Sequence, residues 1–124
     1  MICFPTCKIN LGLRITNKRA DGFHALETVF FPISIKDALE IIIEPDTNAA
    51  PISFTSSGLA INGDPSDNLC FKAYGLLKKD YPTIPNIKMH LHKTIPMGAG
   101  LGGGSSDGAF TLVALNQLFN LHIP

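Results

Sequence analysis

The densest group of residues suited to chemistry is a glycine-rich loop, in which five of the chain's eleven glycines lie between positions 98 and 104. Glycine reaches positive φ without steric cost and lets backbone N–H groups approach a ligand closely. A helix beginning at Ser105 or Ser106 would add unpaired N–H donors and the positive end of its dipole. The pattern therefore predicts a phosphate-binding loop. Its residues are Pro96, Met97, Gly98, Ala99, Gly100, Leu101, Gly102, Gly103, Gly104, Ser105 and Ser106.

Two other glycine motifs fit this segment less well. A P-loop ends in Gly-Lys-Ser or Gly-Lys-Thr, and the segment contains no lysine. Residues 98–103 satisfy the spacing GxGxxG, but no second strand with an acidic residue about 20 positions on follows them. A mobile hinge would seldom lie between an alternating strand and an apolar helix. Phosphate binding is therefore the favoured interpretation.

A second candidate group lies on the strand predicted over residues 7–15. Its odd positions are apolar and its even positions are polar or glycine, which is the period of a strand with one buried face. Lys8, Asn10 and Arg14 are therefore expected to project from the same side. A polar turn with a glycine near its end follows at residues 17–22.

Further strands and two helices must position these groups. Pro32 and Lys36-Asp37 interrupt the apolar runs of the first half of the chain. A helix is expected from about Asp67 to Tyr81, with Ser66 or Asp67 as its N-cap. Residues 107–121 predict a helix that is apolar over most of its circumference and hence deeply buried. The remaining predicted strands span residues 26–35, 38–44, 52–55 and 87–92, and the apolar stripe of the first helix is Leu69, Ala73, Leu76 and Leu77.

Composition bounds the class of protein. A chain of 124 residues is the size of one domain, and 45% apolar against 16% charged residues argue against disorder. Ten basic and ten acidic residues give a net charge of zero, which disfavours nucleic acid or a charged membrane surface as partner. No apolar run approaches the roughly 20 residues of a membrane span. We expect an intracellular domain with no nucleic-acid or membrane partner.

No metal site is expected from the sequence. Cys3, Cys7 and Cys70 form neither a CxxC motif nor a zinc-site spacing, so free thiols in a reducing compartment are the favoured interpretation. His90 and His92 lie two positions apart on one predicted strand and could be two ligands. No third ligand is evident, so an exposed strand face is preferred.

Four separated motifs carry a family resemblance. Residues 96–106 resemble the P-x-G-x-G-L-G-S-S phosphate loop of the GHMP small-molecule kinases. Together with residues 8–11 (KINL), 19–24 (RADGFH) and 67–69 (DNL), they resemble most closely the members that phosphorylate the 2-hydroxyl of 4-diphosphocytidyl-2-C-methyl-D-erythritol, in the methylerythritol phosphate route to isoprenoid precursors. The resemblance covers essentially the whole chain. It implies a cytoplasmic bacterial kinase with an α+β, ribosomal-protein-S5-domain-2-like fold, in which a mixed sheet carries helices on one side.

The resemblance also implies roles for individual residues, with ATP as phosphoryl donor and Mg²⁺ bound with the nucleotide. Lys8 matches the family's active-site lysine beside the accepting hydroxyl, and Asn10 matches a substrate-contacting asparagine. Phe23 stands where tyrosine is usual and would stack on the cytosine ring, while His24 matches a residue that reads the cytosine edge. Without the resemblance, Lys8 would be read as a solvated lysine and His24 as a surface residue.

Asn68 and Lys93 match positions that line the family's adenine and ribose pocket. The alternatives are a residue at a helix N-terminus for Asn68 and a solvated charge at a strand end for Lys93. Two departures bear on the loop. Ala99 replaces a common glycine and should be tolerated if its φ is negative. Asp107 replaces the more usual asparagine, and its direction matters because a carboxylate repels nearby phosphates.

The family's catalytic aspartate lies in a G-A-D-x-P segment that these residues do not contain, and its members are more than twice as long. We therefore expect residues 1–124 to be an incomplete N-terminal domain, inactive alone and prone to self-association through exposed apolar surface. Two alternatives stay open: another GHMP small-molecule kinase, and a non-catalytic nucleotide-binding module.

Overall fold

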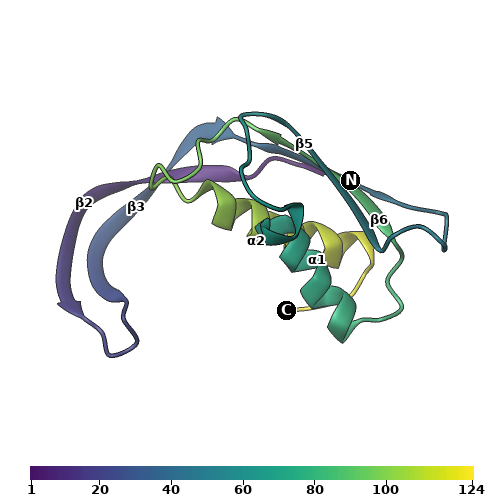
Figure 1. Ribbon diagram of the computed structural model, residues 1–124. Helices are drawn as coiled ribbons and strands as arrows, with labels where there is room; N and C mark the ends of the chain where they lie inside the picture. Colours follow the sequence, from purple (N-terminus) through teal and green to yellow (C-terminus); the bar gives the residue numbers. More distant parts are fainter.

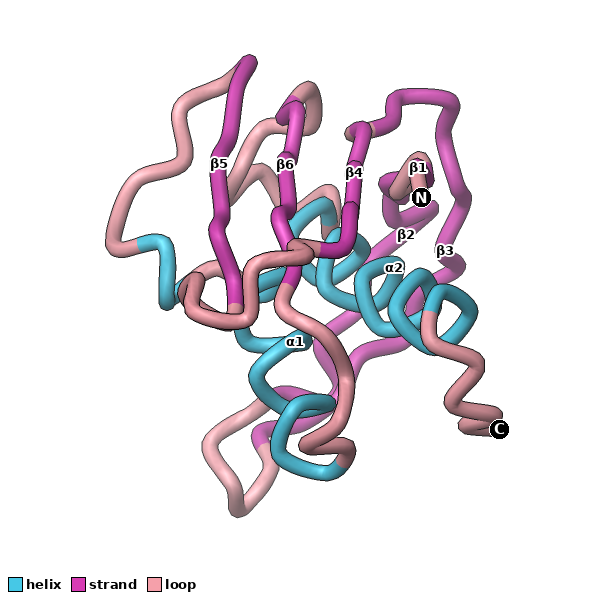
Figure 2. Tube along the Cα trace, turned by 90° about the vertical axis from the view of Figure 1, so that its right-hand side faces the viewer, coloured by secondary structure: helices cyan, strands magenta, loops and turns pink.

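The computed structural model describes residues 1–124 as a mixed sheet covered on one face by two helices, with a long hairpin extending from it (Figures 1 and 2). Its elements are β1 (Ile2–Cys3), β2 (Thr6–Lys18), β3 (His24–Lys36), β4 (Ala38–Ile43), β5 (Ile52–Gly58), the 3-10 turn η1 (Pro65–Asp67), α1 (Leu69–Asp80), β6 (Ile87–Lys93) and α2 (Gly103–Leu118). The main sheet has the order β1-β4-β6-β5. Only β5 and β6 are parallel. The expected α+β fold is confirmed.

The core lies between the four-stranded sheet and the two helices. Ile87, Met89 and Leu91 alternate along β6 and are at most 1% exposed, and Leu39 and Ile41 of β4 lie beside them. Full burial of each such side chain contributes about 1.5–3 kcal/mol to folding. Because β6 is central, its last residue is held rigidly where the glycine loop begins. The two helices and the loop between α1 and β6 complete the core with Cys70, Tyr74, Leu77, Ile84, Ala114 and Leu115.

Strands β2 and β3 form a separate two-stranded sheet, which curves away from the body of the molecule (Figure 1). Pro32 lies within β3 opposite Lys8 and does not break the strand. Since β3 pairs with β2 alone, it has an open edge, where strands tolerate proline. Gly12 has a φ of +70° at a shift in register between Leu11 and Leu13. This bulge interrupts the alternation that was expected to place Arg14 beside Lys8 and Asn10.

The expected buried face of the strand over residues 7–15 is wrong for its distal half. Cys7 is buried and Ile9 half-buried, but Leu13 and Ile15 are 58% and 61% exposed. Val29, on the paired strand, is 61% exposed. The outer part of the hairpin extends past the two helices (Figure 1), which leaves Leu13, Ile15 and Val29 largely exposed.

Helix α1 begins later than predicted. Asn68 is its N-cap, with its side-chain oxygen accepting a hydrogen bond of 2.9 Å from the N–H of Cys70. The predicted N-cap at Ser66 or Asp67 is therefore wrong, because both residues lie in the preceding 3-10 turn, which Asp64 caps and Pro65 begins. The predicted apolar stripe is half right. Ala73 and Leu77 are buried, whereas Leu69 and Leu76 are 46% and 57% exposed.

Helix α2 begins four residues before the predicted start at Asp107 and ends at Leu118. Its buried face includes Thr111, Ala114 and Leu115, but Val113 is 56% exposed. Burial around the whole helix is therefore not observed, and nine of the nineteen exposed large apolar side chains lie on the hairpin. None of the helices has the length and apolar character needed to span a membrane.

Candidate functional site

The glycine loop connects β6 to α2 and has an alternating backbone. Gly98, Gly100 and Gly102 have φ angles of +72°, +74° and +72°. The intervening Ala99 and Leu101 are not among the non-glycine residues with positive φ, so the alanine is accommodated as the condition on its φ required. Alternation of this kind turns successive N–H groups toward one concave side, which favours an anion.

The start of α2 faces the same loop. Its N-cap is Gly102 and has no side-chain capping bond, so the N–H groups of the first turn have no partner from the cap. Such groups, with the helix dipole, attract anions. Gly103 is required sterically, because a Cβ there would lie 2.6 Å from Ile95 Cγ2 and 3.1 Å from Lys93 Nζ. Because α2 begins at Gly103, Ser105 lies within its first turn.

Lys8 is bound to the loop by both its backbone and its side chain. Its N–H donates to the carbonyl oxygen of Leu101 at 3.0 Å. Its ammonium donates to Gly100 O at 2.8 Å and to Asn10 Oδ1 at 2.5 Å, and lies 5.1 Å from the centre of the Phe30 ring. Lys8 and Asn10 therefore lie together at the loop, and a solvated lysine on an open strand face is excluded. Sequence reasoning missed Phe30, whose only signal was an aromatic run.

A cavity of about 120 Å³ lies beside the loop. Its wall includes Asn68, Lys93, Met97, Gly104 and Asp107. The structure thus brings the two residues that resemble nucleoside-pocket positions to the same cavity as the start of α2. Asn68 is also the N-cap of α1. It is therefore both a residue at a helix N-terminus and part of the cavity wall.

The ammonium of Lys93 is enclosed by two carboxylates. Lys93 is 2% exposed and donates to Asp37 Oδ2 at 2.5 Å and to Asp107 Oδ2 at 2.8 Å. A solvated strand-end charge is therefore excluded. Asp107 points inward to the lysine, which offsets the repulsion that its carboxylate would exert on a phosphate. Sequence reasoning missed Asp37, although a lone aspartate between two apolar strands was a signal.

The ionisation of these three groups follows from burial and pairing. Burial opposes ionisation of Asp37, but bonds from Lys93 and from the N–H groups of Ile95 and Thr94 outweigh it and lower its pKa. Burial also opposes the charge on Lys93, yet the two carboxylates raise its pKa. For Asp107 burial dominates and raises the pKa to about 6. Its Oδ1 is buried without a hydrogen-bond partner.

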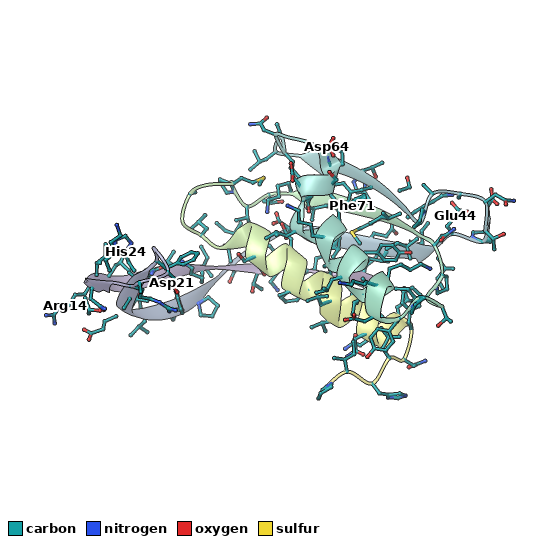
Figure 3. All side chains as sticks on the ribbon, turned by 60° about the horizontal axis from the view of Figure 1, so that its bottom comes forward. Arg14, Asp21, His24, Glu44, Asp64 and Phe71 are labelled. Carbon is teal, nitrogen blue, oxygen red and sulfur yellow. The ribbon has the colours of Figure 1, made fainter.

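Phe23 and His24 lie at the far end of the hairpin. Phe23 is 72% exposed, and His24 pairs with Lys18 in the last rung of the ladder. In Figure 3, His24 projects near Asp21 at the end of the hairpin away from the helices. The structure therefore does not bring these two residues to the glycine loop, and their role in reading a cytosine stays a prediction.

The remaining candidates have ordinary hydrogen-bond partners. His90 Nδ1 lies 2.8 Å from Thr55 Oγ1, and His92 Nδ1 lies 2.9 Å from Ser57 Oγ. The three cysteines are free thiols. No group of three or more His, Cys, Asp or Glu side chains is placed to hold a metal ion.

The sequence of this chain is similar to those of named kinases. Residues 68–124 match the GHMP kinases N terminal domain. The 4-diphosphocytidyl-2-C-methyl-D-erythritol kinase of Bacteroides thetaiotaomicron is 54% identical over 99% of this chain and 44% of its own length. The Cytophaga hutchinsonii protein of the same name is also 54% identical, over 99% of this chain and 43% of its own. The chain thus spans less than half the length of these curated relatives.

Solved structures of two kinases are similar to this chain. A crystal structure of a 4-(cytidine 5'-diphospho)-2C-methyl-D-erythritol kinase superposes with a TM-score of 0.82 at 33% identity, over 100% of this chain and 42% of that one. A homoserine kinase from Cytophaga hutchinsonii gives 0.62 at 18% identity over 74% of this chain and 29% of its own, which speaks for the fold alone. In sequence and in fold, the chain is similar to these kinases, and residues 68–124 match the GHMP kinases N terminal domain.

Proposed function

We propose that residues 1–124 form the nucleotide-binding half of an ATP-dependent kinase that phosphorylates the 2-hydroxyl of 4-diphosphocytidyl-2-C-methyl-D-erythritol. The observation that carries the proposal is the bond from the Lys8 ammonium to Gly100 O at 2.8 Å. It places one flexible cation at a loop whose N–H groups suit phosphates. The 54% identity to kinases of that name supports the choice of acceptor.

Phosphoryl transfer asks a protein mainly for position and electrostatic stabilisation. The loop from Pro96 to Ser106 would hold the ATP phosphates. Lys8 would offset charge on the transferring phosphoryl group and lower the pKa of the accepting hydroxyl. Asn10 would contact the acceptor from the same strand, and Phe23 and His24 would take its cytosine. The group that accepts the hydroxyl proton would come from outside these residues.

The nucleoside of ATP would lie against the cavity that Asn68 and Lys93 help to line. Lys93 contributes there as part of a wall, because both of its neighbouring carboxylates already use its charge. Mg²⁺ would reach the site on the nucleotide phosphates, since no three metal-ligating side chains gather in the structure. The hydroxyls of Ser105 and Ser106 would be its candidate protein ligands.

A chimera tests this function directly. These residues replace the corresponding 123 in the Bacteroides thetaiotaomicron kinase, and ADP release is measured with the cytidyl substrate. We expect activity, and a loss of about 10²–10³ in kcat on Lys8→Ala, the size of effect that one electrostatic contact to a transition state has. Lys79→Ala, at an exposed position on α1, is the control and should leave kcat unchanged.

Two results would count against the proposal. A folded chimera that releases no ADP would remove the assigned acceptor, and full activity of Lys8→Ala would remove the role of the lysine. Competition by cytidine nucleotides separates the proposed acceptor from that of another GHMP kinase. A chimera that binds ATP without transferring phosphate would favour a non-catalytic nucleotide-binding module.

Calorimetry on the chain itself tests the loop. The magnesium complex of a non-hydrolysable ATP analogue is titrated into the wild type and into Gly102→Val. Gly102 has a φ of +72° and a Cβ there would lie 3.3 Å from Lys8 Cε, so the variant should lose binding. Gly75→Ala, on α1 with open space around it, is the matched glycine control. Equal binding by all three proteins would contradict the assignment of the loop.

A further inference from the structure

Asp37 is a buried carboxylate to which the proposed reaction gives no part. It lies between β3 and β4 and is 0% exposed. Its Oδ1 accepts hydrogen bonds from the N–H groups of Thr94 at 2.6 Å and Ile95 at 2.8 Å. These are the first two residues after β6, so one carboxylate oxygen fixes the chain where it enters the glycine loop.

The same residue reaches the far end of the loop and the strand of Lys8. Its Oδ2 binds the Lys93 ammonium, which also binds Asp107 in the first turns of α2. The N–H of Asp37 donates to Pro5 O at 3.0 Å, three residues before Lys8. Three separate segments around the loop are thus tied to one buried residue.

We propose that Asp37 is a positioning residue that holds the glycine loop in its anion-binding conformation. This inference deepens the proposed function and rests on it for the identity of the ligand. A run with glycines at every second position loses much conformational entropy when it is ordered. Fixing both of its ends in the free protein reduces the part of that cost which falls on binding, so affinity rises through preorganisation. Asp37 itself touches no ligand.

The opposite end of the same strand pair offers a matched control. Glu44 directly follows β4 and binds Lys88 of β6 at 2.5 Å, just as Asp37 directly precedes β4 and binds Lys93. Asp37→Asn and Glu44→Gln each remove one carboxylate charge from a lysine of β6. Only the first change lies at the loop, and it leaves Lys93 with Asp107 as partner. Because an amide NH2 cannot accept a hydrogen bond, Asp37→Asn turns a donor toward the N–H groups of Thr94 and Ile95 when its oxygen stays with the Lys93 ammonium.

Two quantities are measured on folded protein: amide exchange of residues 96–104, and affinity for the magnesium complex of a non-hydrolysable ATP analogue. In Asp37→Asn we expect loop exchange at least tenfold faster and affinity about tenfold weaker. In Glu44→Gln we expect both unchanged. Wild-type loop exchange and affinity in Asp37→Asn would overturn the proposal. If the wild type binds no analogue, the proposed function fails for this chain, while loop exchange still decides the role of Asp37.

Asp107→Asn separates positioning from charge balance. It too leaves Lys93 with one carboxylate, but it preserves the bonds that Asp37 accepts from the N–H groups of Thr94 and Ile95, so loop exchange should stay at the wild-type rate. Equal loosening in Asp107→Asn and Asp37→Asn would overturn the proposal. The wild type gives a further test that needs no variant. Exchange of the Thr94 and Ile95 amides should be as slow as that of the β6 amides, and exchange as fast as at the hairpin tip would contradict it.

Discussion

Two lysines border the glycine loop, and their surroundings differ. Lys8, at the start of β2, is half-buried and donates to two neutral oxygens, Gly100 O and Asn10 Oδ1. Lys93, at the end of β6, is buried and donates to two carboxylates. The charge of Lys8 is therefore available to an anionic ligand, whereas that of Lys93 is neutralised within the protein. A lysine that can bind a ligand and a lysine that stabilises the fold can therefore lie beside the same loop. The charge of their hydrogen-bond acceptors distinguishes them.

The largest expected effect is on stability when Lys93 is removed. Lys93→Met leaves Asp37 and Asp107 buried together without a counter-ion, and breaking a buried pair in this way costs about 3–5 kcal/mol. Urea unfolding at neutral pH measures the loss. Lys88→Met, which removes a half-exposed ion pair, should lower the free energy of unfolding by less than about 1 kcal/mol. Equal losses would show that burial of the triad formed by Asp37, Lys93 and Asp107 has no special weight.

The next effect depends on pH and sharpens the contrast within the triad. The pKa of Asp107 is about 6 in the native protein, against an ordinary value of 3.8 in the unfolded chain. As the pH falls, the native protein therefore binds this proton before the unfolded chain does. The resulting stabilisation is complete below pH 3.8 and is lost as the pH rises through 6. An asparagine cannot ionise, so Asp107→Asn should be more stable than the wild type by about 2–3 kcal/mol at pH 7.5.

Urea unfolding of both proteins from pH 4 to 8 gives that difference directly. Because the titrating groups outside Asp37, Lys93 and position 107 are common to the two proteins, the difference reports on this buried cluster alone. It should shrink toward zero as the pH falls to 4. A difference that stays constant over the range would contradict a raised pKa at this position.

A smaller effect concerns the space around two neighbouring glycines, Gly103 and Gly104, at the start of α2. Gly103→Ala places a Cβ 2.6 Å from Ile95 Cγ2, and overpacking of this kind costs about 1–3 kcal/mol. Gly104→Ala meets nothing within 4 Å and should gain up to about 1 kcal/mol, as alanine does over glycine in a helix. Thermal or urea unfolding of the two neighbours compares them. Destabilisation by both would indicate that the first turn of α2 needs glycine for another reason.

The smallest expected change is on the free energy of unfolding of Lys8→Met. Its ammonium has no carboxylate partner to leave unpaired, so we expect a loss of no more than about 1 kcal/mol, the net contribution of an ordinary hydrogen bond. Circular dichroism during urea unfolding is sufficient to measure it. A loss as large as that of Lys93→Met would remove the distinction between the two lysines.

The strands, the helices and the loop could be predicted from local patterns, whereas the fold class followed from the family resemblance. Alternation located β6, and the glycines located the turn before α2. The hairpin was read less well, since period-two alternation shows which side chains share a face but not whether another layer covers that face. Leu13 and Ile15 therefore look like core residues in sequence and are exposed in the structure.

The triad was beyond sequence reasoning for a different reason. Asp37 and Lys93 are 56 positions apart, and nothing local to either residue specifies the other. Lys93 ends an alternating strand, where a charge is ordinarily solvated, so its burial could be inferred only from the position of β4 beside β6. The direction of Asp107 depended on the same tertiary contact. Ion pairs between residues far apart in the sequence can be predicted only once the tertiary fold is known.

The separate pairing of β2 with β3 has a consequence for motion. Within the sheets, residues 6–36 bond only to one another, and the hairpin's distal apolar side chains are exposed. Segments with few buried contacts open at lower free energy than the core. The outer hairpin should therefore open as its own cooperative unit, without disturbing the loop or the helices. Phe23 and His24 lie on that unit, so any ligand that engages them would be seen first as slowed local opening of the hairpin.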